Sequence, residues 1–410
     1  MIASLYAGIS GLSAQATAMT VIGDNIANVN TTAFKSNSSH FANILSNSLG
    51  GESATSGVGR GVEFWGASAQ WTQGSLENSA NSTDLAINGK GFFMVEDVSG
   101  SRFYTRAGSF SFDKEGYLVN PDGLKLQGYQ LNASGGIGSI TDIYVPGERI
   151  SPPSATTEFN FDINLSSTAV AGDTYTTAQT VYDSLGNAVP MTLTFTRQAA
   201  ARTWAVTGSI PTTSGTGMTF GGAASTNIVF DASGAMITPA ADVTVALALT
   251  NGATTPLSLT WDFYNGTVSH GDVTGFSSTS GTTFQYQDGY PAGSLRSIGV
   301  SEEGIVTATY SNGEMTPLFQ VSLVDFPSYD GLTKMGRNLY AESLGSGQAL
   351  PGIVGNGRLG SIAPSSLEMS NVDLAQEFVK MITTQRAFQA NSRVITSSDE
   401  ILQELINIKR

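Results

Sequence analysis

The sequence predicts a mainly β protein with α-helical termini, in which long N- and C-terminal helices pair as a coiled coil and two β domains are nested between them. Three observations support this. Apolar residues recur at alternating steps of three and four at both ends of the 410-residue chain. Short runs of alternating polar and apolar residues, bounded by turn residues, fill the middle. One stretch of that middle, 146–284, differs in composition from its flanks, which indicates an insertion.

The last segment, 366–410, is predicted to form a helix whose start Asn371 or Asp373 can cap. It presents a coiled-coil seam. The seam positions are Leu374, Phe378, Met381, Gln385, Phe388, Ser392, Ile395, Asp399, Leu402 and Ile406. The three polar members lie one heptad apart. They either set the register of the seam or face a wet central channel, and we favour the channel because three polar side chains in one dry seam are costly.

The first segment, 1–35, carries a matching apolar stripe. Its positions are Ile2, Leu5, Ile9, Leu12, Ala16 and Met19, continued by Ile22, Ile26 and Val29. Two matching stripes at opposite ends of one chain predict that the helices pair. Pairing leaves part of each stripe uncovered, so we expect the remainder to pack against the same helices in neighbouring subunits.

Between the helices, the sequence predicts linkers and short strands. Gly-rich and Ser-rich composition indicates connectors, and alternation between turn signals indicates strands. The inserted segment is rich in Ser and Thr, which is typical of an independent β sandwich or barrel. The predicted order is a linker at 36–68, a first β domain at 69–145, the inserted β domain at 146–284, the return of the first domain at 285–351 and a linker at 352–365.

Composition excludes several classes of function. Only 13% of residues are charged and the formal net charge is −14, which argues against nucleic acid or an anionic membrane as a partner. The absence of cysteine excludes disulfides and thiolate metal sites. No apolar run approaches the length of about 18 residues that a membrane helix needs, and no cleavable signal peptide is expected. No convergent acid–base set is found, so we predict no enzyme activity and no cofactor.

A motif closes the first helix. Its residues are Asn25, Ile26, Ala27, Asn28, Thr31, Phe34 and Lys35. The stretch resembles the N-terminal signature of the flagellar rod, hook and hook-associated axial proteins. Two positions depart from that signature, with Asp24 in place of Asn and Ala33 in place of Gly. Because Ala tolerates a positive φ poorly, we predict an ordinary backbone conformation at Ala33.

A second motif opens the last helix and resembles the C-terminal signature of the same family. Its residues are Ser370, Asn371, Val372, Asp373, Gln385, Arg386, Phe388, Gln389 and Asn391. The length of the chain and its large insertion resemble the hook members of the family rather than the shorter distal rod members.

The resemblance implies a structural subunit that self-assembles into a flexible helical tube, a universal joint that transmits torque between rod and filament. It implies partners besides the chain itself: the distal rod protein, the hook cap protein, the hook-filament junction proteins and the flagellar export apparatus. It places the chain outside the cell, in the hook of the flagellum, after export without a cleaved signal peptide. The alternatives are another rod or hook-associated axial protein, and a secreted β-rich adhesin.

Overall fold

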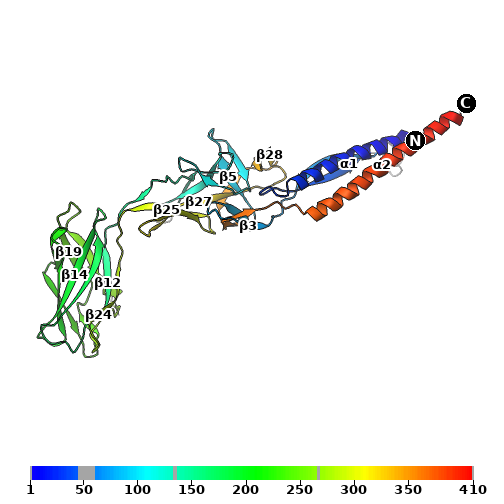
Figure 1. Cartoon of the computed structure of the whole chain (residues 1–410). Coiled ribbons are helices and arrows are strands. Elements are labelled where there is room, and N and C mark those ends of the chain that lie inside the picture. Colours follow the sequence, from blue (N-terminus) through cyan, green and yellow to red (C-terminus); the bar gives the residue numbers. More distant parts are fainter. Residues whose placement is uncertain (1, 45–60, 133–135, 266–267, 409–410) are drawn as a thin grey trace. The chain divides into compact units, whose positions relative to one another are not determined.

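The computed structural model describes residues 2–44, 61–132, 136–265 and 268–408. These fall into two compact units, and the second is inserted in the sequence of the first (Figure 1). Unit 1 comprises Met1–Gly147, Ser297–Ala308 and Met315–Arg410, and unit 2 comprises Glu148–Arg296 and Thr309–Glu314. Unit 2 therefore extends further along the chain than the insertion predicted at 146–284.

The two terminal helices, α1 (Ile2–Ala27) and α2 (Leu374–Ile408), pack side by side, which confirms the predicted pairing (Figure 1). Both are shorter than predicted. Helix α2 begins at Leu374 because Asp373 caps it: its Oδ1 accepts hydrogen bonds from the backbone N–H groups of Ala375 at 2.9 Å and Gln376 at 3.2 Å. The residues after Ala27 form turns instead of continuing the helix.

The helix contact is built differently from the predicted seam. On α1 it is lined by small buried residues at Gly8, Gly11, Ala14 and Ala18. A Cβ added at Gly8 would lie 3.0 Å from Cγ1 of Ile395, so the two backbones approach closely. On α2 the covered series, whose members are buried or partly buried, is Glu377, Met381, Thr384, Ala387, Phe388, Asn391, Ser392, Ile395, Ser398 and Leu402.

Much of the predicted seam therefore lies outside this contact. On α1, Ile9 is 47% exposed, whereas Leu5, Leu12, Met19 and Ile26 are partly buried and Ile22 is buried. On α2, five predicted positions belong to the covered series: Met381, Phe388, Ser392, Ile395 and Leu402. The predicted positions that stay exposed are Leu374, Phe378, Gln385 and Asp399. The side chains of Ile2 and Ile406 lie outside the described residues.

The strands of unit 1 form one large antiparallel sheet and several two-stranded pairs. They are β1 (Asn37–Asn43), β2 (Val62–Ala69), β3 (Leu76–Asn78), β4 (Leu85–Asn88), β5 (Phe92–Glu96), β6 (Arg102–Thr105), β7 (Ser111–Phe112), β8 (Leu118–Val119), β9 (Lys125–Leu131), β10 (Ile137–Asp142), β27 (Met315–Asp325), β28 (Thr333–Gly336), β29 (Leu339–Ala341), β30 (Leu350–Ile353), β31 (Ser361–Pro364) and β32 (Ser366–Glu368). The large sheet runs in the order β27-β9-β5-β6-β29-β28. Apolar side chains of β5, β6 and β27, including Phe92, Tyr104 and Val324, form its core.

Both predicted linkers contain strands. The segment 36–68 supplies β1 and most of β2, which pair as an antiparallel hairpin against α1. The segment 352–365 supplies β31, where buried Ile362 pairs with Ile87 of β4. Small polar residues obscured the alternation of these strands in the sequence. Residues 45–60 of the first predicted linker lie outside the described residues.

Unit 2 encloses its own apolar core between two sheets. Its strands are β11 (Ile150–Ser151), β12 (Glu158–Asn164), β13 (Thr174–Tyr182), β14 (Ala188–Arg197), β15 (Thr203–Ser209), β16 (Gly215–Phe220), β17 (Ser225–Phe230), β18 (Met236–Thr238), β19 (Val243–Leu249), β20 (Leu257–Trp261), β21 (Tyr264–Asn265), β22 (Val268–Ser269), β23 (Val273–Thr274) and β24 (Gly281–Gln287). The sheet orders are β16-β19-β20-β12-β23, with β24 on β12, and β13-β14-β15-β17-β18. Trp261 lies buried in the core between them. Strands β25 (Gly293–Val300) and β26 (Ile305–Tyr310) are each divided between the units.

Candidate functional site

A buried carboxylate joins the two motifs predicted from the sequence. Glu368, fully buried at the end of β32, accepts from Lys35 Nζ at 2.5 Å and from Arg106 Nη1 at 3.3 Å. The backbone N–H of Gly74 donates to the same carboxylate at 3.0 Å. Buried charges are tolerated when they are paired and their remaining hydrogen-bonding capacity is used, as it is here. We call Lys35, Arg106 and Glu368 the charged clasp.

The clasp cations are held by backbone oxygens as well. Lys35 Nζ donates to the carbonyl of Thr72 at 2.8 Å, and Arg106 donates to the carbonyls of Gly91 at 3.1 Å and Gly89 at 2.6 Å. Burial lowers the pKa of Lys35, and the attraction of Glu368 opposes that shift. The arrangement fixes the chain after α1 to three other segments of unit 1.

Backbone contacts continue this junction. The N–H of Ala33 donates to the carbonyl of Glu368 at 2.7 Å. Ala33 has a φ of 57°, so the predicted ordinary conformation at this position was wrong. The strain of a left-handed Ala, about 1 kcal/mol, is carried because this hydrogen bond and burial fix the turn. The left-handed turn lets the chain leave α1 and meet β32.

Asn371 does not cap α2, since Asp373 does so, and its side chain makes other hydrogen bonds. Its Oδ1 accepts from the N–H of Ser36 at 2.8 Å, and its Nδ2 donates to the carbonyls of Gln70 at 2.8 Å and Thr72 at 3.1 Å. One amide side chain thereby ties the residue after Lys35 to the segment that follows β2. Its geometry uses both ends of an amide, which neither Asp nor Leu could reproduce.

Asn25 holds the two helices and the hairpin together at their base. Its Nδ2 donates to the carbonyl of Asn37 in β1 at 2.9 Å and to Glu377 Oε2 in α2 at 3.2 Å. Its Oδ1 accepts from the N–H of Asn37 at 2.8 Å. Lys380 completes the group with an ion pair to Glu377 at 2.7 Å. Asn25 and Glu377 are both buried, and each has hydrogen-bond partners for its polar side-chain atoms.

The remaining motif residues are local or exposed. Thr31 donates to Asn28 Oδ1 at 3.1 Å, and Asn28 Nδ2 donates to the carbonyl of Asp24 at 2.9 Å, which closes the end of α1. Partly buried motif residues are Ile26, Phe34, Ser370, Val372, Phe388 and Asn391. Exposed motif residues are Ala27, Gln385, Arg386 and Gln389.

Sequence reasoning missed Arg106, Glu368 and Glu377 as parts of the junction. A local signal existed for Glu377, which shares the heptad spacing of the covered face of α2. Glu368 and Arg106 lie far from Lys35 in the sequence, and no local pattern indicates that they meet.

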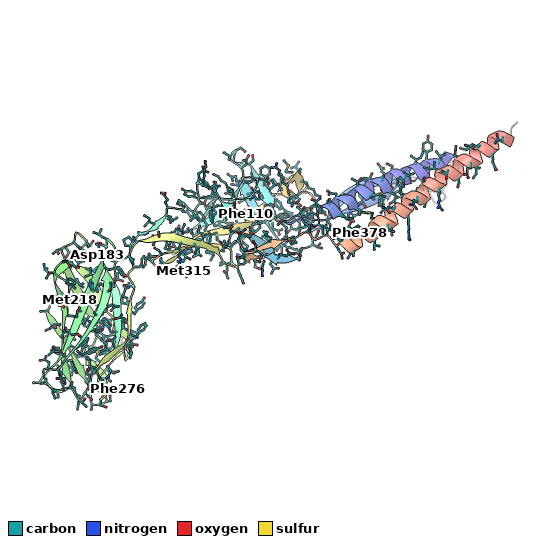
Figure 2. All side chains as sticks on the ribbon, in the orientation of Figure 1. Phe110, Asp183, Met218, Phe276, Met315 and Phe378 are labelled. Carbon is teal, nitrogen blue, oxygen red and sulfur yellow. The ribbon has the colours of Figure 1, made fainter. Side chains whose placement is uncertain are left out.

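On the sides turned away from their mutual contact, both helices expose apolar side chains. On α2, Phe378 is 50% exposed (labelled in Figure 2) and Ile382 is 49% exposed, with Leu374 and Val379 also exposed. On α1, Tyr6 and Ile9 are exposed. Contiguous apolar surface of this kind marks an interaction site.

No feature of the described residues indicates catalysis. The part of the chain that the structure describes has no group of three or more His, Asp or Glu side chains suited to a metal. Within the same residues, no helix is long and apolar enough to cross a membrane. A cleft of about 350 Å³ lies beside the junction, lined by Asp24, Thr31, Lys334, Arg337 and Tyr340 among others, and its polar groups form no acid–base set.

Comparison with known proteins identifies the family. Along the whole length of this chain and of its own, the flagellar hook protein FlgE of Borreliella burgdorferi is 32% identical. The FlgE protein of Escherichia coli is 34% identical over 98% of this chain and 98% of its own. The FlgE protein of Salmonella typhimurium is also 34% identical, over 99% of this chain and 100% of its own. The chain belongs to the flagellar hook protein family.

Family models cover the parts of this hook protein in order. They are the flagella basal body rod protein at 5–35, the flagellar hook protein FlgE/F/G D1 domain at 86–168, the flagellar basal body protein FlaE D2 domain at 154–290 and the flagellar basal body rod FlgEFG protein C-terminal at 363–408. The crystal structure of Helicobacter pylori flagellar hook protein FlgE2 shares the fold, with a TM-score of 0.51 at 16% identity over 72% of this chain and 99% of that one. The family consists of structural proteins, so this hook protein is not an enzyme.

Proposed function

We propose that this chain is the structural subunit of the bacterial flagellar hook and self-assembles into a flexible helical tube that transmits torque between rod and filament. One observation carries the proposal. The terminal helices are paired and held together at their base by the junction, yet apolar side chains such as Ile9 and Phe378 remain exposed to solvent. Together with full-length similarity to hook proteins, this favours a protein whose helices finish their packing in a polymer.

The geometry of the polymer follows from the asymmetry of the subunit. The exposed faces of α1 and α2 differ in sequence, which permits a face on one copy to meet a different face on the next copy. Such heterologous contacts produce an open helix when the rotation between copies does not close a ring. A tube of this kind grows by adding identical subunits to its end.

Flexibility is supported by the low charge of the chain. With 13% charged residues, few ion pairs can form between neighbouring subunits. Contacts made by apolar and hydroxyl groups are non-directional or weak, so subunits can slide as the tube bends. The bending of a universal joint then costs little free energy per contact.

The partners beyond the chain itself are the distal rod protein, the hook cap protein, the hook-filament junction proteins and the flagellar export apparatus. Export proceeds without a cleaved signal peptide. In the assembled tube Gln385, Ser392 and Asp399 face the central channel, which is supported by the exposure of Gln385 and Asp399.

Electron microscopy of the purified protein tests the function. At high concentration and high salt, we expect curved tubes of uniform diameter made of this chain alone. A protein that stays monomeric under all such conditions would overturn the proposal.

A further inference from the structure

The β1–β2 hairpin has one face on α1 and one face in solvent. Its α1 side is fixed by Ser10, whose Oγ accepts from the N–H of Val62 at 3.3 Å. Gly61 lies so close that a Cβ there would fall on Ser10 Oγ. The opposite face, which we call the hairpin outer face, carries Glu63 and Trp65.

Trp65 occupies a β-bulge. In the register of the hairpin, Phe41 pairs with Phe64 and His40 pairs with Gly66, so Trp65 has no residue opposite it. A bulge changes the direction in which the side chains around it point, and bulges are common beside functional sites. The indole is 81% exposed, next to an edge-to-face pair of Phe41 and Phe64 whose centroids are 6.2 Å apart. An ordered Trp held in water is the residue type most enriched among binding hot spots.

A second unpartnered face lies on α2. Val379, Ile382 and Arg386 are spaced three and four residues apart, so they share one side of the helix. All three are exposed, because Met381 and Thr384 turn the other side toward α1. We call Val379, Ile382 and Arg386 the α2 outer face.

The two faces complement each other in chemistry. One offers an indole and a carboxylate, and the other offers aliphatic side chains and a guanidinium. Neither Glu63 nor Arg386 has an ion-pair partner among the residues that the structure describes. A guanidinium over an indole adds a cation–π attraction to the ion pair.

The faces do not meet within one molecule. Ser10 of α1 points to the hairpin, whereas Gly8 and Gly11 of α1 meet Ile395 and Asn391 of α2. Successive residues of a helix are rotated by about 100°, so the hairpin and α2 lie on different sides of α1. Two complementary faces on different sides of one subunit are the requirement for a heterologous, repeating contact.

We propose that the hairpin outer face of one copy packs on the α2 outer face of a second copy, with Trp65 on Val379 and Ile382 and with Glu63 paired to Arg386. This contact rests on the proposed function, since it names the partner surface that the assembled tube uses. It links neighbouring subunits laterally through their terminal helices.

Cysteine cross-linking tests the contact, because the natural chain has no cysteine. The double variant Trp65→Cys with Ile382→Cys is assembled into tubes, oxidised and run on a denaturing gel. We expect a ladder of covalent oligomers. The matched control, Trp65→Cys with Glu404→Cys, places its second thiol on the same helix about 33 Å further along and gives no ladder. Single-cysteine variants give at most dimers.

The outcomes separate the contact from the function. Tubes of the double variant without a ladder overturn the contact and leave the hook assignment standing. Wild-type protein that forms no tubes overturns the function itself. A covalent monomer with an internal cross-link also overturns the contact, because the two positions would then meet within one chain.

Charge reversal provides a second test that does not depend on oxidation. Glu63→Arg and Arg386→Glu are each expected to raise the critical concentration for assembly about tenfold, because like charges then face each other across the contact. The double variant restores the wild-type value. Effects that simply add in the double variant would overturn the pairing.

Discussion

The junction at the base of the helices and the outward faces of the same helices differ in how their side chains are surrounded. At the junction, Glu368, Lys35 and Arg106 are buried and every charge has a partner within the chain. On the outward faces, Phe378 and Ile9 are apolar and about half exposed to water. The contrast teaches that the chain fixes the direction of its helices by itself and leaves their lateral packing to other copies.

Breaking the charged clasp gives the largest expected effect. Glu368→Gln removes the anion between two buried cations, so the free energy of unfolding of unit 1 should fall by about 3–5 kcal/mol. Denaturant titration of the monomer measures it. The matched control is Glu96→Gln, which breaks the exposed pair with Arg102 and should cost under about 1 kcal/mol. Equal losses in the two variants would contradict a buried, paired junction.

Alkaline pH probes the packing beside the clasp. Burial raises the pKa of Tyr340 to about 12, above the ordinary value of about 10. The folded form therefore holds its proton more tightly, so this contribution to stability is complete below pH 10 and is lost as pH rises toward 12. Tyr340→Phe should remove up to about 2–3 kcal/mol of that pH-dependent fall. Unfolding curves of both proteins, measured from about one unit below the ordinary Tyr pKa up to the raised pKa of about 12, show the difference.

A substitution on the exposed faces should impair assembly and leave the stability of the monomer nearly unchanged. Phe378→Ser changes a half-exposed side chain, so the free energy of unfolding of the monomer should move by less than about 0.5 kcal/mol. Assembly should be lost or shifted to much higher concentration, as measured by sedimentation. A large loss of monomer stability without loss of assembly would show that Phe378 serves the subunit and not the polymer.

The smallest effect is expected at Ala33. Ala33→Gly relieves about 1 kcal/mol of left-handed strain and loses a buried methyl worth about 0.8 kcal/mol, so stability should stay within about 0.5 kcal/mol of wild type. Ala33→Val, with a branched side chain at positive φ in a buried turn, should cost more than about 2 kcal/mol. Thermal unfolding compares the three proteins, and equal stability of the Gly and Val variants would contradict the turn geometry.

Periodicity predicted the two helices, because apolar spacing depends only on local sequence. It did not predict which residues form their contact. Gly8 and Gly11 allow the two helix backbones to approach closely, but they are not large apolar residues. The predicted seam therefore followed a neighbouring stripe of larger apolar residues. Small polar residues concealed the β1–β2 hairpin in the same way.

The family motifs identified Lys35, Asn25 and Asn371 but not what they bind. Glu368 and Arg106 meet Lys35 only after the two ends of the chain have come together, and such pairings have no signature in one sequence. The positive φ of Ala33 was not predicted, because the prediction relied on the backbone preference of alanine. The conformation is instead fixed by the hydrogen bond from the Ala33 N–H to the Glu368 carbonyl.

Hydrogen exchange on the free subunit and on the assembled tube tests the central claim most directly. We expect the amides at 25–37 and 366–377 to be protected in both states, because the junction is complete within one chain. We expect the amides at 385–405 to exchange faster than the junction in the free subunit, where only one side of α2 is packed on α1, and to become more protected in the tube. Equal exchange of 385–405 in the two states, or rapid exchange at the junction, would contradict the account.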